Sequence, residues 1–245
     1  MKRIKLVVAY DGTAYHGWQL QPGALTIEGE LNKALSRLLG EQIKVIGASR
    51  TDSGVHALGN VAVFDTESRI PAEKLSYALN QKLPEDIRIQ SSCEVEPDFH
   101  PRHCGSRKTY EYRILCREFP QPVKRLYSYF TYHKLDVKRM QEAAAYLVGE
   151  HDFKSFCSVN TVVESTVRRL DSVAVEEQGE EIVIRVRGNG FLYNMVRIIA
   201  GSLMEVGMGK TEPEELPGIL NALDRQAAGP TAPACGLTLV QYEFL

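Results

Sequence analysis

The hydrophobic pattern of the first hundred residues alternates between strand and helix periods. Alternation over residues 2–10 puts most apolar side chains on one face of a strand, and a 3.6-residue period follows. The predicted elements are a strand at 2–10, a helix that begins after Thr26 and is closed by Gly40, strands at 43–46 and 61–64, a helix near 71–82, and a strand at 87–95. This β-α-β-β-α-β order is typical of ferredoxin-like folds.

A similar order returns after a boundary at residues 98–102. The predicted elements are strands at 109–115 and 127–132, a helix at 136–147, strands at 167–175 and 182–187, helices at 191–206 and 214–223, and a strand at 237–244. We therefore predict the α+β class with two ferredoxin-like halves, residues 1–100 and 101–245. The two halves share this pattern but no obvious sequence identity.

A polar loop, GASRTDSGVHA at residues 47–57, lies between two of the predicted strands. Its tripeptide Asp52-Ser53-Gly54 is typical of a tight turn, in which the carboxylate caps the turn and the glycine adopts a positive φ. By itself the tripeptide indicates no more than a turn. Arg50 two residues before the aspartate and His56 four residues after it make the loop distinctive, although His56 fits a residue that holds its turn.

This loop closely resembles the signature of the tRNA pseudouridine synthases of the TruA family. That pattern usually reads GRTDAGVHA, so Ser49 and Ser53 are departures, which we interpret as variation. Four further segments resemble family motifs in the right order: YDGTAYHGWQ at 10–19, KTYEY at 108–112, GNGFLYNMVR at 188–197 and PACGLTL at 233–239. The resemblance covers nearly the whole chain.

The resemblance implies a role for five residues. Asp52 corresponds to the catalytic aspartate and Arg50 to an active-site arginine, while Arg197 is implied to pair with the aspartate. Tyr110 is implied to pack on the target base, and Leu237 to touch it. The resemblance also implies that the two halves join into one mostly antiparallel sheet with a cleft between them, and that a homodimer holds the anticodon stem-loop of tRNA.

The implied reaction converts uridine to pseudouridine without a cofactor, since nothing is oxidised. Asp52 acts as a carboxylate nucleophile, or assists cleavage of the N-glycosidic bond while the sugar forms a glycal; the sequence leaves both open. The target uridine must first be unstacked from the neighbouring bases of the RNA, which costs roughly a few kcal/mol of free energy. A base removes the C5 proton after C5 bonds to C1′.

Two other functions fit parts of the sequence. A non-catalytic RNA-binding module of tandem RRM-like domains suits aromatic strand residues such as Tyr110 and Tyr112, but it gives no reason for Asp52 between Arg50 and Gly54. A nucleoside or glycoside hydrolase breaks the same bond, but usually needs a paired carboxylate or a metal. Release of the C5 hydrogen distinguishes the isomerase from a binder.

Composition and charge limit how the protein could bind RNA and indicate its compartment. The chain has 245 residues, 44% of them hydrophobic and 24% charged, and a formal net charge of −2. RNA binding must then depend on local basic clusters, such as Arg102–Arg113 with its interleaved tyrosines and Lys124-Arg125. The five cysteines are widely spaced without a C-x-x-C pair, which favours reduced thiols in the cytoplasm. No segment has the apolar length of a membrane span.

The sequence also argues against metal and nucleotide cofactors. The six histidines show no H-x-x-x-H or H-x-E pattern, so we expect no metal site. Residues 188–197 have a superficial likeness to a dinucleotide fingerprint, but Tyr193 stands where the third glycine belongs and the surrounding pattern is not a parallel β-α-β unit.

Overall fold

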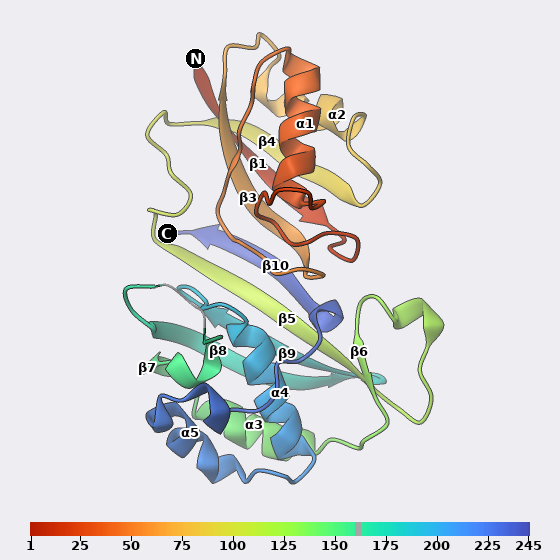
Figure 1. Ribbon diagram of the computed structural model, residues 1–245, viewed down its shortest axis with the longest axis vertical. Helices are drawn as coiled ribbons and strands as arrows, with labels where there is room; N and C mark the ends of the chain where they lie inside the picture. Colours follow the sequence, from red (N-terminus) through yellow and green to blue (C-terminus); the bar gives the residue numbers. More distant parts are fainter. Residues whose placement is uncertain (160–162) are drawn as a thin grey trace. The chain divides into compact units, whose positions relative to one another are not determined.

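The computed structural model describes residues 1–159 and 163–245 (Figure 1). It contains two compact units. The first comprises Met1–Gly105 together with Leu239–Leu245, and the second comprises Ser106–Thr238. The last strand, β10 (Leu237–Phe244), thus belongs for most of its length to the first unit, although it follows the second in the sequence.

The sheet of the first unit has the strand order β4-β1-β3-β10. Strand β1 (Lys2–Tyr10) pairs antiparallel with β3 (His56–Thr66) and with β4 (Ile87–Val95). The register sets Ile4 opposite Phe64 and Leu6 opposite Ala62, and all four side chains are buried. The alternation predicted for residues 2–10 therefore does mark the core face of the sheet.

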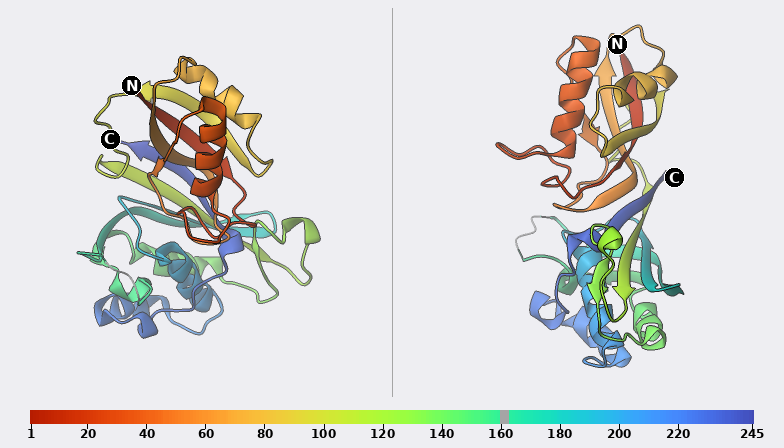
Figure 2. Two further views of the ribbon diagram at one scale, coloured as in Figure 1. Left: turned by 45° about the horizontal axis from the view of Figure 1, so that its top comes forward. Right: turned by 90° about the vertical axis from the view of Figure 1, so that its right-hand side faces the viewer.

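Two helices complete the first unit. Helix α1 (Ile27–Leu39) begins at Thr26, whose hydroxyl accepts a hydrogen bond from the Gly29 N–H, and ends at the C-cap Gly40, as predicted. It lies along one side of the strands (Figures 1 and 2). Helix α2 (Leu75–Asn80) is shorter than the predicted 71–82 because a 3₁₀ turn, Ala72–Lys74, precedes it.

The predicted strand at residues 43–46 is wrong for most of its length. Only Ile46 lies in a strand, the two-residue β2 (Ile46–Gly47), which pairs with β3. Side chains of α1 take the backbone donors that a ladder would need: the Ile43 N–H donates to Ser36 Oγ and the Val45 N–H to Asn32 Oδ1. Residues 43–45 are therefore coil rather than strand, with Ile43 and Val45 buried.

The sheet of the second unit has the order β5-β9-β8-β7. Strands β5 (Ser106–Cys116), β8 (Val167–Gln178) and β9 (Glu181–Gly188) lie where the sequence predicts them and pair antiparallel, β5 and β8 each with β9. The predicted strand at 127–132 is reduced to β6 (Tyr129–Thr131), which pairs parallel with β5. Strand β7 (Gly149–Asp152) was not predicted, since its residues are mostly polar.

The helices of the second unit are grouped together (Figure 1). They are α3 (Val137–Ala145), which is capped by the Asp136 carboxylate, α4 (Met195–Gly207) and α5 (Leu216–Ala222). The predicted start of α4 at residue 191 is wrong. Asn194 adopts the left-handed conformation, with φ 61°, and so separates residues 191–193 from the helix.

The α+β class and the mostly antiparallel sheet are thus confirmed. In the described part of the chain, no helix is both long and apolar enough to span a bilayer. None of the five cysteines forms a disulfide there.

We predict that Gly201→Ala destabilises the protein. A Cβ at Gly201, inside α4, would stand 1.8 Å from the Pro230 carbonyl oxygen, so backbone has to move. The expected loss is about 1–3 kcal/mol of unfolding free energy, measured by denaturant titration. The control is Gly218→Ala in α5, where the Cβ meets nothing within 4 Å; it should gain up to about 1 kcal/mol from helix propensity. Equal stability of the two variants would contradict this account of α4 packing.

Candidate active site

The signature loop, residues 47–57, connects β2 to β3 and carries Asp52 at a tight turn. The Val55 N–H donates to the Asp52 carbonyl at 3.2 Å, and Gly54 adopts a φ of 78°. Asp52 is half-buried, whereas Thr51 before it and Val55 after it are buried. The turn therefore holds a carboxylate at the surface between two buried anchors.

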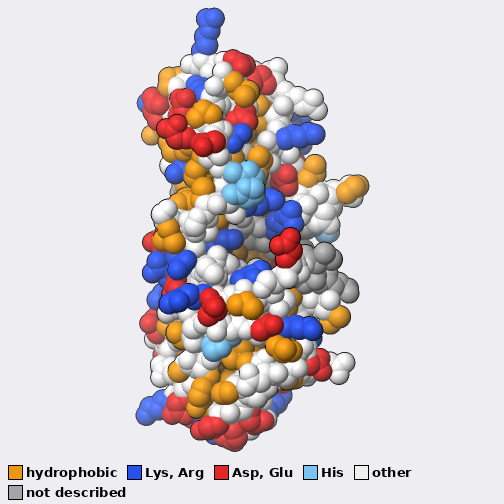
Figure 3. Space-filling model, turned by 90° about the vertical axis from the view of Figure 1, so that its left-hand side faces the viewer, with side chains coloured by type: hydrophobic (Ala, Val, Ile, Leu, Met, Phe, Trp, Pro, Cys, Tyr) orange, Lys and Arg blue, Asp and Glu red, His pale blue; other side chains and the backbone are white. Residues whose placement is uncertain are grey.

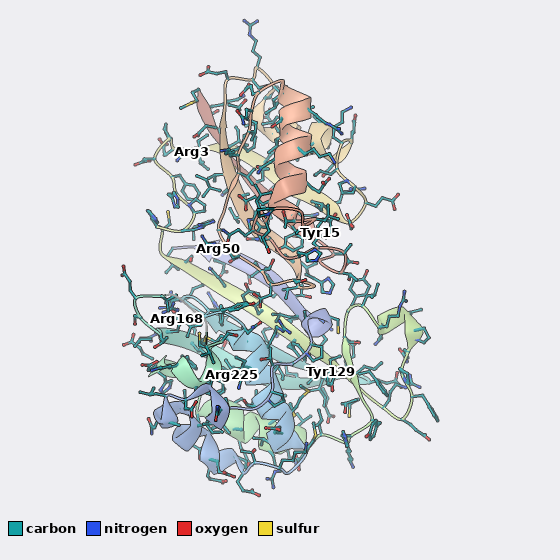
Figure 4. All side chains as sticks on the ribbon, in the orientation of Figure 1. Arg3, Tyr15, Arg50, Tyr129, Arg168 and Arg225 are labelled. Atoms are coloured by element: carbon teal, nitrogen blue, oxygen red, sulfur yellow. The ribbon has the colours of Figure 1, made fainter. Side chains whose placement is uncertain are left out.

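A second loop braces this turn from the side. The bracing loop, residues 11–21, donates one hydrogen bond to the turn and accepts two from it: the Trp18 N–H donates to Thr51 O at 3.0 Å, while Tyr15 O accepts from the Gly54 N–H and the Ser53 hydroxyl. Gly17 permits the approach, because a Cβ there would lie 2.5 Å from Thr51 O and its φ is 87°. Tyr15 is labelled in Figure 4.

A buried polar network lies beneath the loop. Asn60 of β3 is fully buried; its amide accepts from the Ser49 N–H, donates to Ser49 O at 3.0 Å and donates to the Tyr10 hydroxyl at 3.3 Å. The Tyr10 hydroxyl lies 2.8 Å from Thr51 Oγ1. Burial raises the pKa of Tyr10, so the phenol stays neutral. Ser49 and Thr51, on either side of Arg50, are thereby fixed.

His56 joins the two loops. Its Nδ1 accepts a hydrogen bond from the Gly12 N–H at 3.1 Å, and Asp11 Oδ1 lies 3.1 Å from the same nitrogen. Both contacts hold the buried ring against the start of the bracing loop. His56 therefore holds its turn, as the sequence predicts.

The two departures from the family signature have different consequences. Ser53 gains the hydrogen bond to Tyr15 O that alanine lacks. Ser49 Oγ is buried and has no hydrogen-bond partner among the described residues, a cost of roughly 1–3 kcal/mol for a desolvated hydroxyl. Neither change disturbs the backbone bonds around Asp52.

Arg102 is a site residue whose contact the sequence analysis missed. Its Nε donates to the Gly47 carbonyl at 2.7 Å, at the start of the signature loop. Burial lowers the pKa of Arg102, and the positive charge of Arg50 lowers it further. Arg50 itself is exposed and is labelled in Figure 4. The two arginines thus lie close enough to interact electrostatically.

Tyr110 belongs to the second unit, on a strand that is buried on both faces. Its ring packs edge-on against Phe191, with centroids 5.1 Å apart and planes at 83°. Tyr110 is only 7% exposed, and its strand neighbours Thr109 and Glu111 are also buried. Glu111 is paired with Arg113 and Arg185, each at 2.7 Å. This part of β5 is therefore a rigid support for an aromatic ring.

Arg197 and Leu237 lie elsewhere in the second unit. Arg197, in the first turn of α4, donates from Nε to Ala232 O at 2.7 Å and from Nη1 to Asn194 Oδ1 at 2.8 Å. Leu237 is buried at the start of β10. Tyr112 links these segments to β5: its hydroxyl donates to Pro233 O at 2.9 Å, and its pKa is raised by burial and lowered in part by the charge of Arg197.

The sequence-predicted site residues therefore form two sets. Asp52 and Arg50 share one loop of the first unit, and Tyr110, Arg197 and Leu237 lie in or at the edge of the second. Sequence reasoning missed Asn60 and the contact of Arg102 with Gly47. The signal for Asn60 was one polar residue inside the apolar run of β3. In the described residues, no group of three or more His, Cys, Asp or Glu side chains is arranged to hold a metal ion.

Comparison with known proteins gives one consistent result. A family model described as tRNA pseudouridine synthase matches residues 6–103 and 143–244. The tRNA pseudouridine synthase A of Acetivibrio thermocellus is 48% identical over 244 residues, which is 100% of both chains. The protein of the same name from Brevibacillus brevis is 51% identical over 244 residues, again 100% of both chains. These matches cover both units.

We predict that Tyr10→Phe loosens the signature loop. The change removes the hydroxyl that contacts Thr51 Oγ1 and Asn60 Nδ2, and should cost about 1–3 kcal/mol because those buried groups lose a partner. Hydrogen exchange of the amides at 49–52 should become faster than in Tyr77→Phe, whose ring is 69% exposed. Unchanged exchange at 49–52 would show that the network does not hold the loop.

Proposed function

The chain belongs to the tRNA pseudouridine synthase family, and we propose that it isomerises uridine in the anticodon stem-loop of tRNA with Asp52 as the catalytic nucleophile. Pseudouridine formation makes the protein an isomerase. The bond between N1 and C1′ breaks, C5 bonds to C1′, the C5 proton leaves and N1 gains a proton. Atoms and electrons balance without a redox partner, so we propose no cofactor and no metal.

The observation that carries this proposal is the way the signature loop is held. Thr51 and Ser49 are fixed by Trp18, Tyr10 and Asn60, so the backbone that carries the half-buried Asp52 is held in place. A nucleophile that must reach one reacting atom benefits from such preorganisation. Asp52 either attacks directly or assists glycosidic cleavage while the sugar forms a glycal, and the loop supports both.

Arg197 is proposed to pair with Asp52 and keep it ionised. Two hydrogen bonds, to Ala232 O and Asn194 Oδ1, orient its guanidinium plane. A positive planar group beside a carboxylate favours the charged form and directs it by a two-point contact. Asn194 lies directly before α4 and has a left-handed backbone conformation. This conformation sets the position of the side-chain oxygen that accepts from Arg197.

Tyr110, Leu237 and Arg50 are proposed to bind the substrate. The aromatic ring of Tyr110, supported by Phe191, suits stacking on the target base, and the apolar Leu237 suits contact with its edge. Arg50 is exposed beside Asp52 and suits a phosphate or sugar oxygen. Together these contacts would offset the cost of taking the uridine out of its stack.

The cytoplasm is the proposed compartment. The relatives are bacterial enzymes named for action on tRNA, and the described cysteines form no disulfide.

Asp52→Asn tests the central role. The amide keeps the size and most hydrogen bonds of the side chain but removes the negative charge, so tRNA binding should stay within about threefold while pseudouridine formation falls below detection. Binding is measured by fluorescence anisotropy and product by nucleoside chromatography after digestion, since pseudouridine and uridine have equal mass. The matched control is Glu85→Gln, which removes one exposed carboxylate elsewhere in the same unit. Substantial product from Asp52→Asn would rule out the proposed mechanism.

Arg197→Lys separates charge from geometry. Lysine keeps the positive charge but loses the planar fork that bonds Asn194 and Ala232. We expect kcat to fall by roughly 100-fold with little change in tRNA affinity. Arg139→Lys, at the surface pair with Glu212, should leave both unchanged. A normal kcat for Arg197→Lys would remove the proposed pairing.

The family resemblance also leads us to propose a homodimer, with one tRNA stem held across both subunits. Multi-angle light scattering at micromolar protein should then give twice the mass of the 27.4 kDa chain. Full activity of a species that scatters as a monomer would exclude it.

A further inference from the structure

A pair of stacked imidazoles lies in the segment that follows β4. The rings of His100 and His103 are 4.0 Å apart between centroids, with planes at 30°. The His103 N–H donates to His100 O at 3.0 Å, and the Arg102 N–H donates to His100 Nδ1 at 3.3 Å. His103 is exposed and His100 half-buried. The backbone thus holds two titratable rings face to face at the protein surface.

Arginines surround this pair. The Arg102 side chain is anchored to Gly47 O and lies near the exposed Arg50. Arg3 also acts on His100, but Asp65 binds it at 2.7 and 2.8 Å. The carboxylates that act nearby are Asp98 on Arg3 and Glu28 on Arg102, the latter together with Tyr242.

Anionic partners are scarce at this cluster. In the part of the chain that the structure describes, no ion pair is formed by Arg50, Arg102, His100 or His103, whereas Arg3, Arg107, Arg113 and Arg185 each have one. Histidine side chains lie beside Lys or Arg side chains on the face drawn in Figure 3. A site with two exposed guanidinium groups and no carboxylate partner suits an anion from outside.

We propose that His100, His103, Arg102 and Arg50 bind a phosphodiester of the RNA substrate and that the imidazole pair takes up one proton when it binds. This rests on the proposed function, which supplies the RNA. Arg102 joins this cluster to the signature loop. It lies between the two histidines in the sequence, and its side chain is hydrogen-bonded to the Gly47 carbonyl of that loop. The phosphate contact would therefore lie next to the loop that presents Asp52.

The direction of the pH dependence follows from the charges. In the free protein, burial lowers the pKa of His100, and the positive charges of His103, Arg102 and Arg3 lower it further. A bound phosphate adds negative charge and raises the pKa of His100 again. Protonation then favours the complex, so affinity is highest below the pKa of His100 in the free protein and declines as pH rises through its higher pKa in the complex.

The test measures the affinity for a tRNA transcript from pH 5.5 to 8.5 at constant ionic strength, using fluorescence anisotropy. For the wild type, the slope of log Kd against pH should reach about +1 at its steepest, which corresponds to one proton. Calorimetry in two buffers of different ionisation enthalpy should give the same proton uptake. The double variant His100→Asn with His103→Asn should lose this slope, while the control His151→Asn, whose ring bonds Val148 O, should keep it.

The possible outcomes distinguish failure of this inference from failure of the proposed function. A wild type that binds tRNA with a flat pH profile, or a double variant that keeps the full slope, overturns the inference and leaves the proposed function standing. A wild type that binds no tRNA defeats the proposed function itself. Because proton uptake is measured on the wild type, the inference stays testable even if the double variant does not fold.

Discussion

The signature loop depends on one buried polar constraint, the binding of Ser49 by Asn60 and of Thr51 by Tyr10. An asparagine inside an apolar strand is costly unless its amide is satisfied, and here the amide bonds Ser49 of the signature loop, the Tyr10 hydroxyl and the Val61 N–H. The bracing loop closes the other side through Trp18 and Tyr15. The backbone on either side of Asp52 is therefore fixed by the core of its unit as well as by the turn itself, which gives this short polar loop a defined conformation.

Helix caps and strands that depend on residues close together in the sequence could be predicted from it. The cap at Thr26, the strand Ile87–Val95 and the cap at Asp136 all follow from residues within a few positions of each other. Residues 43–45 failed as a strand because Ser36 and Asn32, from the preceding helix, take their backbone donors. The return of β10 to the first unit likewise depends on partners more than a hundred residues away, which local periodicity does not contain.

The candidate site divides in the same way. Asp52 and Arg50 could be predicted as site residues because their motif is contiguous, and Tyr110, Arg197 and Leu237 because each lies in a motif of its own. The Arg102 contact with Gly47 joins positions 55 residues apart and has no sequence signature, so only the structure reveals it. The sequence did mark the segment around Arg102 as basic and aromatic, but not which of its side chains would be held against the signature loop.

We propose that the Asp52 carboxylate serves an isomerisation, and not binding alone or hydrolysis. The most direct test is tritium release from tRNA labelled at uridine C5, incubated with excess enzyme. The account predicts release of the label to water in step with pseudouridine formation, because the C5 hydrogen is lost when C5 bonds to C1′. Binding of the labelled tRNA without release, or appearance of free uracil that keeps its tritium, would contradict it.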